Sequence, residues 1–344
     1  MKLRVCIPTA GTGSRLGDLV KNINKSLIQV SNKPTISHQI EMFPNGTEFV
    51  IALGYKGHLV KEYLQLTYPK KKFYFSYVND FTSKNSGLGL SLLSCKRYLN
   101  QPFIFLSCDT ILKGELPKLD KNWMGYASNI DLAEYRSIDI KKNLVKQINE
   151  KESHNENSKA YIGVCGIFDY SKFWHEMKTG GLAAIHTGEV YGLKFLIKKN
   201  VKAKKFKWYD TGNLQNLKKT RSNFKKRNTP TILEKENEAI WFANNLVVKF
   251  STDKKFIRNR VIRSEYLTGY IPKINSYARY MYTYKKKEGK IISKIVDEEL
   301  FKKLLAHSKL FWKKSNLSIG EERAFLKICK KFYYDKTYER VDEF

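Results

Sequence analysis

The first 110 residues alternate short apolar runs with amphipathic stretches, and this alternation constrains the fold more than any other feature of the chain. The strand-like runs are 3–10, 47–55, 72–78 and 102–110. Stretches with helical apolar spacing lie between them, at 33–43, 57–68 and 86–99. This order is typical of a parallel sheet that is covered by helices on both faces. The sequence therefore predicts an α/β fold, Rossmann-like, with a mixed but mostly parallel sheet.

The pattern becomes less regular in the middle of the chain. Strand-like runs occur at 144–152 and 161–170, and a strand, a tight turn and a helix are expected over 204–224. A polar, proline-containing stretch without periodicity follows at 225–238 and suggests a domain boundary.

A second unit is expected beyond that stretch. Its elements are a strand-like run at 241–250, a very basic helix at 254–270, a strand pair at 277–292 and an amphipathic helix at 297–314. We therefore predict a first domain at 1–226, a linker at 227–238 and a smaller α+β domain at 239–344.

The chain is strongly basic, with 63 Lys and Arg against 33 Asp and Glu and a net charge of +30. Such a charge suits nucleic acid, but it equally suits a negatively charged small substrate such as a nucleotide. No apolar run reaches the roughly 20 residues that span a bilayer. The first residues lack the apolar core of a signal peptide, so we expect a cytoplasmic protein with no membrane span.

A glycine-rich loop follows the first predicted strand and has the chemistry to hold phosphates. Gly11 and Gly13 let the backbone turn and bring N–H groups close to phosphate oxygens. Arg15 adds a bidentate fork and Lys25 a point charge. The loop is no Walker motif, because GKS/T is missing. The residues expected to contact the nucleotide are Ala10, Gly11, Thr12, Gly13 and Ser14.

Two aspartates stand at places where a divalent cation could bind. Asp109 ends a predicted strand, and Asp210 precedes a Thr-Gly turn. Mg²⁺ prefers hard oxygen ligands, typically one or two carboxylates together with phosphate oxygens. The two aspartates are therefore predicted to hold Mg²⁺, although an aspartate that caps a turn would look the same in the sequence.

The segment GTGSRLGDLVKNINKSLIQVSNKP resembles the opening signature of the sugar-phosphate nucleotidylyltransferases, especially the glucose-1-phosphate thymidylyltransferase type. The glycine turn, Arg15, Lys25 and Lys33-Pro34 fall at the family's spacing. One departure is Asn24, where the family usually has proline, and it puts the rigidity of the loop in doubt. Further matches extend the resemblance over about residues 1–225, and it implies a GT-A-type fold.

The resemblance also implies roles for individual residues. In SGLGLSLL, Gly87 lies where the family's helix opens beneath the nucleotide base, so it is expected to bind nucleotide. Glu150 and Lys151 match the family's pair that contacts the sugar and its phosphate. Gly166, in the strand that follows, completes the expected substrate-binding set. Asp109 and Asp210 match the metal aspartates, and Glu189 lies near a family acidic position, a weaker match.

The activity implied by the resemblance is transfer of a nucleoside monophosphate from an NTP to a phosphorylated small molecule, with release of pyrophosphate. The acceptor is expected to be a sugar 1-phosphate used for surface polysaccharide precursors, and the donor to be CTP, UTP or dTTP. Arg15 and Lys25 are expected to stabilise the charge that develops during the transfer. A homo-oligomer is also compatible with the resemblance.

The second unit resembles the amino-terminal lobe of the choline-kinase and aminoglycoside-phosphotransferase group. NNLVVKF places Lys249 as the strand lysine that touches ATP phosphates, and RNRVIRSEYLTGY places Glu265 as its helix partner. Those kinases need a catalytic loop of the HxDxxxxN kind. None follows Glu265, so the lobe is expected to be truncated or inactive, and no kinase activity is expected.

Three alternatives stay open at this point. The first is a CTP-dependent cytidylyltransferase for phosphocholine, because VNDFTSKNSGLGLSLL has a faint likeness to those enzymes. The second is a non-catalytic, basic nucleic-acid-binding protein, supported by the charge and the aromatic content. It is disfavoured because no RRM, KH, zinc or helix-turn-helix signature occurs. The third is a regulatory subunit without turnover.

Overall fold

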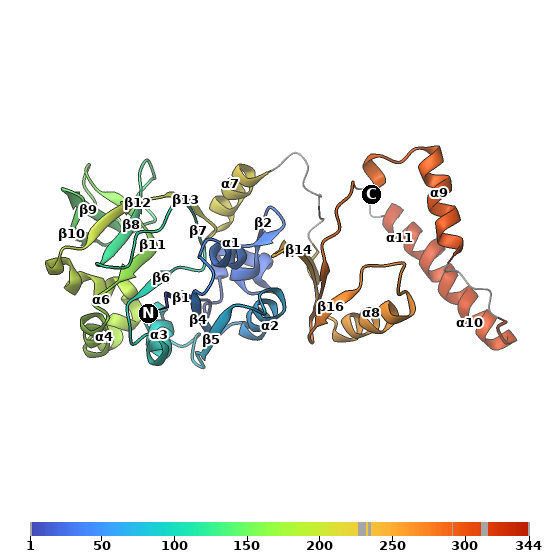
Figure 1. Cartoon of the computed structure of the whole chain (residues 1–344), viewed down its shortest axis with the longest axis horizontal. Helices are drawn as coiled ribbons and strands as arrows, with labels where there is room; N and C mark the ends of the chain where they lie inside the picture. The colour runs from blue at the N-terminus through green and yellow to red at the C-terminus, as the bar shows by residue number, and fades with distance from the viewer. Residues whose placement is uncertain (1, 226–231, 233–234, 291, 311–315, 343–344) are drawn as a thin grey trace. The chain divides into compact units, whose positions relative to one another are not determined.

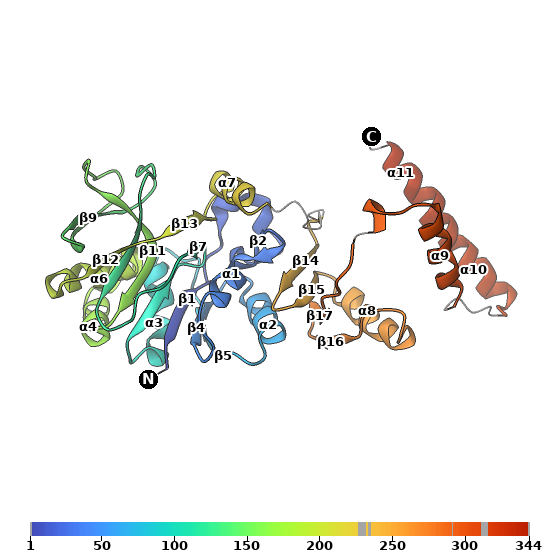
Figure 2. The same cartoon turned by 45° about the horizontal axis from the view of Figure 1, so that its top comes forward.

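The computed structural model describes residues 2–225, 232, 235–290, 292–310 and 316–342. The chain divides into two compact units, Met1–Glu288 and Gly289–Phe344, which are considered one at a time. Figures 1 and 2 show the elements of each unit.

A nine-stranded sheet forms the centre of the first unit. In sheet order its strands are β5 (Lys72–Tyr77), β4 (Glu48–Leu53), β1 (Arg4–Pro8), β6 (Phe103–Leu106), β11 (Lys159–Ile167), β8 (Trp123–Ala127), β12 (Lys202–Lys205), β10 (Leu144–Asn149) and β9 (Ser137–Lys141). Each of the four strand-like runs predicted in the first 110 residues is a strand of this sheet.

Helices join the strands of the first half as predicted. They are α1 (Thr35–Glu41), α2 (Gly57–Thr67) and α3 (Leu88–Cys95). Strands β5, β4, β1 and β6 pair in parallel with one another, as strands joined by helical crossovers do. The α/β class is therefore confirmed.

Helices cover both faces of this half, because alternate residues of each strand face opposite sides. Val5 and Ile7 of β1 pack in one hydrophobic core with residues of α1 and α2. Cys6, between them, packs in a second core with residues of α3, α4 (Tyr170–Thr179) and α6 (Glu189–Leu196). The loops at the carboxyl ends of the parallel strands are thereby held by a core on each side.

The other half of the sheet contains the strands that make it mixed. β11 runs antiparallel to β6, β8 and β9, and β10 runs antiparallel to β9 and β12, whereas β12 and β8 pair in parallel. Among the nine strands, only β11 and β10 therefore point against the direction of β1, and the prediction of a mixed, mostly parallel sheet is confirmed. β9 and β10 are antiparallel neighbours because a two-residue turn, Lys142-Asn143, joins them, and both of its residues have positive φ.

Two small ribbons and a helix complete the predicted first domain. The ribbons pair β2 (Gln29–Val30) with β3 (Lys33–Pro34) and β7 (Thr110–Lys113) with β13 (Lys207–Asp210). Helix α7 (Leu214–Phe224) follows β13 and is capped by the side chain of Asn213, which accepts a hydrogen bond from the Asn216 amide. The predicted strand, turn and helix over 204–224 are confirmed.

A four-stranded antiparallel sheet belongs to the same compact unit. Its order is β14 (Glu238–Ala243), β15 (Leu246–Ser251), β17 (Met281–Lys285) and β16 (Ile274–Tyr277), and α8 (Lys254–Tyr266) follows β15. The expected single strand at 241–250 is wrong: Asn244-Asn245 makes a two-residue hairpin turn, with φ of 48° and 59°.

This sheet packs on the first domain through Trp241. The Trp241 ring is 1% exposed and lies edge-on to Tyr63 of α2, with ring centroids 5.3 Å apart. The side chain of Asn244 donates to the Thr67 carbonyl at 2.6 Å. The predicted linker at 227–238 falls largely outside the described residues, so that boundary stays a prediction.

The second unit contains helices. They are η5 (Ile292–Lys294), α9 (Glu298–Lys309), α10 (Ile319–Cys329), the π-helical turn Lys330–Asp335 and α11 (Lys336–Asp342). The predicted amphipathic helix corresponds to α9, although its last predicted residues fall outside the described ranges. Within those ranges, no helix in either unit is long and apolar enough to cross a bilayer.

Candidate active site

The loop after β1 holds the residues that the sequence predicts to contact a nucleotide. Ala10 is buried, and its carbonyl accepts a hydrogen bond from the Tyr55 amide at 2.9 Å. Gly13 has a φ of 73°, which glycine adopts without steric cost, and it precedes the 3₁₀ helix η1 (Ser14–Val20). The exposed residues of the loop are Gly11, Ser14 and Arg15, and Thr12 is half-buried. The loop is thus fixed at its base and open at its tip.

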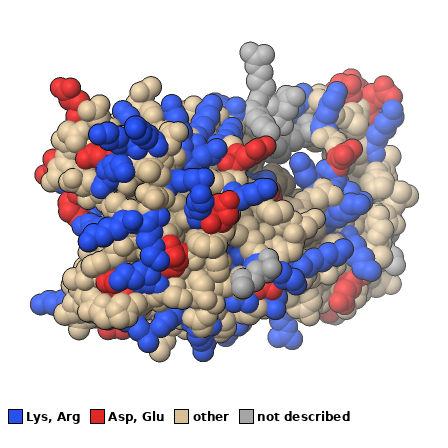
Figure 3. All heavy atoms as spheres, turned by 60° about the vertical axis from the view of Figure 1, so that its left-hand side comes forward, with Lys and Arg blue, Asp and Glu red and all other residues tan. Residues whose placement is uncertain are grey.

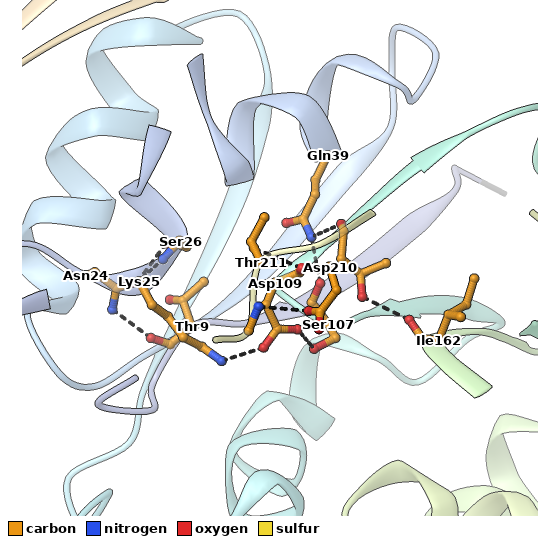
Figure 4. Close-up of polar contacts among 12 residues, drawn as sticks. Thr9, Asn24, Lys25, Ser26, Gln39, Ser107, Asp109, Ile162, Asp210 and Thr211 are labelled. Atoms are coloured by element: carbon orange, nitrogen blue, oxygen red, sulfur yellow. Dashed lines mark hydrogen bonds and ion pairs between the residues drawn. The ribbon is translucent and has the colours of Figure 1, made fainter. Parts of the chain in front are cut away.

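Asn24 supplies the rigidity that proline gives in the resembling family. It is fully buried, and its Nδ2 donates to the carbonyls of Thr9 at 2.9 Å and Tyr55 at 2.6 Å. Its Oδ1 accepts from the amide and the hydroxyl of Ser26, as Figure 4 shows. These bonds tie the residue before Lys25 to the end of β1 and to the loop between β4 and α2. Hydrogen bonds therefore fix this part of the loop, although the residue before Lys25 is asparagine and not proline.

Lys25 and Asp109 form an ion pair, with 2.9 Å between Nζ and Oδ2 and less than a fifth of either side chain exposed. Burial alone would lower the pKa of Lys25, but the attraction of Asp109 raises it above its ordinary value. Burial would likewise raise the pKa of Asp109, but the charge of Lys25 and the hydrogen bond from Ser107 lower it to about 2. Both groups are consequently charged at neutral pH.

Asp109 and Asp210 lie side by side around Gly212. A Cβ atom at position 212 would be 3.1 Å from Oδ1 of Asp210, 3.5 Å from Oδ2 of Asp109 and 3.7 Å from Nη2 of Arg15. Burial raises the pKa of Asp210, and the negative charge of Asp109 raises it further. Two carboxylates that repel each other in a partly dry site suit a divalent cation, which would offset the repulsion.

The residues present therefore fit Mg²⁺, provided that phosphate oxygens supply the remaining ligands. Among the described residues, no group of three or more His, Cys, Asp and Glu side chains could hold a metal by itself. The two-carboxylate arrangement agrees with this, because a metal there would be completed by the phosphates of a nucleotide.

Backbone anchors fix the turn that carries Asp109 (Figure 4). Gln39 Nε2 donates to the carbonyls of Ser107 at 2.6 Å and Thr110 at 2.8 Å. Thr211 donates from its amide and its hydroxyl to the Asp109 carbonyl, both at 2.9 Å. Asp109 and the Asp-Thr-Gly turn are thus held in one rigid piece, although they are a hundred residues apart.

A pocket of about 230 Å³ opens beside the two aspartates. Four of the predicted site residues line it: Arg15, Lys151, Asp109 and Asp210. Aromatic and charged side chains that the sequence did not single out line it as well, namely Glu134, Tyr135, Arg136, Tyr161 and Trp208. Lys25 reaches the site through its ion pair with Asp109.

Glu150 lies next to this pocket rather than in its lining. Its carboxylate accepts from Arg136 Nε at 2.8 Å and from Lys194 Nζ at 2.7 Å, and these two cations lower its pKa. Arg136 does line the pocket. The predicted Glu150–Lys151 pair is therefore divided, with Lys151 at the pocket and Glu150 bound to a residue of its wall.

Two predicted glycines have packing roles in the structure. A Cβ atom at Gly87 would lie 2.3 Å from the Ile185 carbonyl oxygen, so this glycine lets α3 approach α5 (Gly181–Thr187). A Cβ atom at Gly166 would lie 2.1 Å from Trp123 Nε1. Gly163, three residues earlier, lines the pocket instead. The ligand-binding roles of Gly87 and Gly166 stay predictions.

The two predicted residues of the kinase-like lobe lie on β15 and α8. Lys249 is in β15 and Glu265 is in α8, in the order that the resemblance requires. Burial, followed by the charge of Arg260, lowers the pKa of Lys249. In the described part of the chain, no ion pair joins Lys249 to Glu265.

Comparisons with known proteins show what the fold resembles. No family model matches the chain. The bifunctional protein GlmU of Methanococcus vannielii is 23% identical over 255 residues, which cover 70% of this chain and 59% of that protein. GlmU of Methanocaldococcus jannaschii is 24% identical over 47% of this chain, and the match covers 38% of that protein. A probable glucose-1-phosphate cytidylyltransferase of Bacillus subtilis is 28% identical over 33% of this chain and 43% of that protein. The chain thus spans between about two fifths and three fifths of these relatives.

Solved structures agree on the fold. A UDP-glucose pyrophosphorylase complexed with UDP-glucose superposes with a TM-score of 0.56 at 18% identity, over 65% of this chain and 98% of that one. A CTP:phosphocholine cytidylyltransferase from Streptococcus pneumoniae gives the same TM-score at 21% identity, over 65% of this chain and all of that one. About two thirds of the chain therefore has a nucleotidylyltransferase fold. These matches lend no support to a choline-kinase-like lobe.

Proposed function

We propose that this protein is a nucleotidylyltransferase that joins a nucleoside monophosphate to a phosphorylated small molecule. The observation that carries the proposal is the convergence of Arg15, Asp109 and Asp210 around Gly212, with Lys25 paired to Asp109. One carboxylate is fixed in the turn after β6 and the other at the end of β13, and a basic, glycine-containing loop faces them. This combination suits a triphosphate and a divalent cation better than it suits a nucleic-acid strand.

The reaction is an in-line displacement at the α-phosphorus of the NTP. A phosphate oxygen of the acceptor forms a bond to that phosphorus, and the bond from the α-phosphorus to the oxygen that bridges to the β-phosphorus breaks. Pyrophosphate leaves with the electron pair of that bond. The attacking phosphate is already ionised near neutral pH, so no general base is needed, and catalysis depends on positioning and charge.

Each charged residue has a defined part in this scheme. Asp109 and Asp210 would hold Mg²⁺, which when bound neutralises phosphate charge. Lys25, positively charged at neutral pH, is held beside Asp109 and is placed to stabilise the charge that develops on the α-phosphate. Arg15, on the exposed loop, can bind the departing pyrophosphate with its planar guanidinium. Lys151, at the pocket wall, can bind the phosphate of the acceptor.

The acceptor and the nucleotide are proposed from similarity alone. Similar proteins are named for sugar phosphates and for phosphocholine, so we propose a sugar 1-phosphate, with phosphocholine as the runner-up. CTP, UTP and dTTP are the proposed donors. A role in surface polysaccharide precursors, and a homo-oligomer, are proposed on the same ground.

The four-stranded sheet carries a second, weaker proposal. Lys249 lies on a strand and Glu265 on a helix, the elements that the kinase resemblance assigns to them, but no ion pair joins the two in the described part of the chain. We propose at most that Lys249 contacts an ATP phosphate, and we propose no phosphotransfer.

The test is pyrophosphate release by the purified chain. Each of CTP, UTP, dTTP, GTP and ATP is offered with Mg²⁺ and with a panel of sugar 1-phosphates and phosphocholine. We expect turnover with one combination, and its loss in Asp109→Ala and Asp210→Ala. Absence of both turnover and Mg²⁺-dependent NTP binding would overturn the proposal and favour the nucleic-acid alternative, for which affinity should fall steeply with salt.

A further inference from the structure

Lys25 lies on a 3₁₀ helix of only three residues, η2 (Lys25–Leu27). This helix links the segment that leaves η1 to the β2–β3 ribbon. Its closing hydrogen bonds run from the amides of Leu27 and Ile28 to the carbonyls of Asn24 and Lys25, at 2.9 and 3.2 Å. So short a helix fixes few residues by itself. The position of Lys25 therefore depends on contacts that hold the chain before and after η2.

The four-stranded sheet contacts the chain three residues before Lys25. The side chain of Asn22 donates from Nδ2 to the Glu236 carbonyl at 3.1 Å and to Oδ1 of Asn237 at 3.0 Å. Asn237 directly precedes β14, and its carbonyl accepts from the amide of Thr252, the residue that follows β15, at 3.0 Å. One partner of Asn22 is thus fixed by the sheet itself.

The same sheet contacts the chain again after Lys25. The Phe242 amide, on β14, donates to the Asn32 carbonyl at 2.7 Å. Ser31 and Asn32 form the turn of the β2–β3 ribbon, and both have positive φ. Figures 1 and 2 both show β14 beside β2. The small sheet therefore holds the chain on both sides of η2.

Groups of the first domain hold the same segment from another direction. The Tyr55 hydroxyl donates to the Val20 carbonyl at 3.1 Å, and the ammonium group of Lys56 donates to the Lys21 carbonyl. Both donors lie in the loop between β4 and α2. The segment from Val20 to Asn22 is thus held by this loop and by the small sheet. If the contacts with the sheet are lost, the loop alone holds this segment.

The contacts of Asn22 are neutral in a molecule whose surface is basic. Lys and Arg outnumber Asp and Glu on the face that Figure 3 shows, in keeping with the net charge of +30. One ion pair accompanies the Asn22 contacts, Lys21 with Glu236 at 2.7 Å. More than half of each side chain is exposed, so this pair contributes little and salt screens it. The neutral amide contacts do not depend on salt in this way.

We propose that the four-stranded sheet contributes to catalysis by positioning η2, and that Asn22 is a positioning residue that acts through Lys25. This inference rests on the proposed function and deepens it, because it gives the sheet a part in the transfer. Lys25 is assigned to charge that develops in the transition state. A small displacement of η2 therefore lowers kcat more than it changes the KM for the NTP.

The first test is steady-state pyrophosphate release by variants of the full chain. Asn22→Ala removes both bonds to the sheet and should lower kcat by about 10-fold, with a much smaller change in the KM for the NTP. Asn237→Ala removes one of the two acceptors and should lower kcat less. Lys21→Ala removes only the exposed ion pair and should leave kcat nearly unchanged. A kcat of Asn22→Ala equal to that of the natural protein would overturn the inference.

A second asparagine provides the matched control. Asn244 also joins the small sheet to the first domain, but its side chain donates to the Thr67 carbonyl of α2. Its φ is positive, so glycine can replace it without strain. Asn244→Gly should lower the midpoint of urea unfolding at least as much as Asn22→Ala and leave kcat unchanged. If both variants lower kcat in proportion to their loss of stability, the sheet has a structural role only and the inference is wrong.

A double-mutant cycle tests whether Asn22 acts through Lys25. In the Lys25→Ala background, Asn22→Ala should cause little further loss of kcat, because the group that it positions is already gone. The same 10-fold loss in both backgrounds would show that Asn22 acts by another route, and it would overturn the inference.

Amide hydrogen exchange keeps the inference apart from the proposed function. Asn22→Ala should speed exchange at the Leu27 and Ile28 amides, which close η2, by about 5-fold or more, and Asn244→Gly should not. Faster exchange in a protein without turnover would support the positioning of η2 and leave the proposed transfer alone wrong. Unchanged exchange at both amides would overturn the inference, whether or not the natural protein turns over.

Discussion

The two sides of the candidate pocket are completed in different ways. On the nucleotide side, Asn24, Lys25 and Asp109 find their hydrogen-bond partners within the protein. On the proposed acceptor side, the Tyr161 hydroxyl, Glu189 Oε2 and Trp208 Nε1 are buried and make no well-formed hydrogen bond with the described residues. The Tyr161 hydroxyl and the Glu189 carboxylate do act on each other, since each contributes to the shift in the other's pKa. The comparison teaches that the fold gives the charged groups proposed to act on phosphate good partners of their own, and pairs the buried polar groups of the other side less well.

The largest expected effect is on the nucleotide side. Asp109→Asn removes the negative charge that pairs with Lys25 and would hold the cation, so kcat should fall by about 100-fold or more. Steady-state pyrophosphate release measures this, with the exposed Asp120→Asn as the matched control. A kcat within a few-fold of the natural protein would contradict the role given to this side.

A pH-dependent stability effect is expected on the acceptor side. Burial raises the pKa of Glu189 from its ordinary value of 4.5 to about 7, so above pH 4.5 the unfolded state loses this proton first and the folded state is destabilised. Glu189→Gln removes this cost. Its free energy of unfolding relative to the natural protein should therefore rise between about pH 4.5 and 7, by about 3 kcal/mol in total.

Thermal or urea unfolding at pH 5 and pH 8 measures this difference in the absence of Mg²⁺. The control is Glu176→Gln, because Glu176 is also buried but pairs with Lys172 at 2.5 Å. Identical pH profiles for Glu189→Gln and the natural protein would show that the acceptor side does not carry an uncompensated carboxylate.

A smaller effect is expected at Asn24. Asn24→Ala leaves the carbonyls of Thr9 and Tyr55 without these donors and should destabilise the fold by about 2 kcal/mol in urea unfolding. Asn24→Pro loses the same bonds, but the φ of −74° suits proline, so about 0.5–1 kcal/mol should be regained relative to alanine. If Asn24→Ala were as stable as the natural protein, the hydrogen bonds of Asn24 would not stabilise the nucleotide side, and the contrast with the other side of the pocket would be wrong.

The smallest effect is expected at the rim of the pocket. Lys194 pairs with Glu150 at 2.7 Å, but 40% and 50% of these side chains are exposed. Lys194→Gln should therefore change the free energy of unfolding by less than about 1 kcal/mol, and added salt should shrink the difference. A larger, salt-independent loss would mean that Glu150 acts as a structural anchor.

The sequence predicted the parallel half of the sheet because each of its strands is a continuous apolar run bounded by a helix. Every residue of β4 is buried, which is the strongest form of that signal. The other half was harder to predict. β12 is made largely of lysine, so its sequence does not look like a strand, and it joins the sheet by pairing with β8. The Asn244-Asn245 turn could have been predicted, because asparagine tolerates the left-handed backbone conformation that both residues adopt. Recognising this turn would have divided the expected strand into β14 and β15.

The candidate site shows the same limit. Asp109 and Asp210 could be predicted from local motifs, because each stands at the end of a strand or in a turn with its own signature. Tyr161 and Trp208 have no such signature. Their place at the pocket depends on which strands meet, and neither segment alone predicts that β13 pairs with β7. The sequence around Glu189 matched the family only weakly, and the structure shows that this side chain is buried at the start of α6.

The contact between Trp241 and Tyr63 determines where this chain can be shortened without exposing its core. Both rings belong to one hydrophobic core, which also contains Phe250 and Met281 from the small sheet. A fragment that ends at the predicted linker would expose the apolar surface of α2 to water, and we expect it to aggregate or to be digested quickly by proteases. A fragment that ends at 288 keeps that core whole.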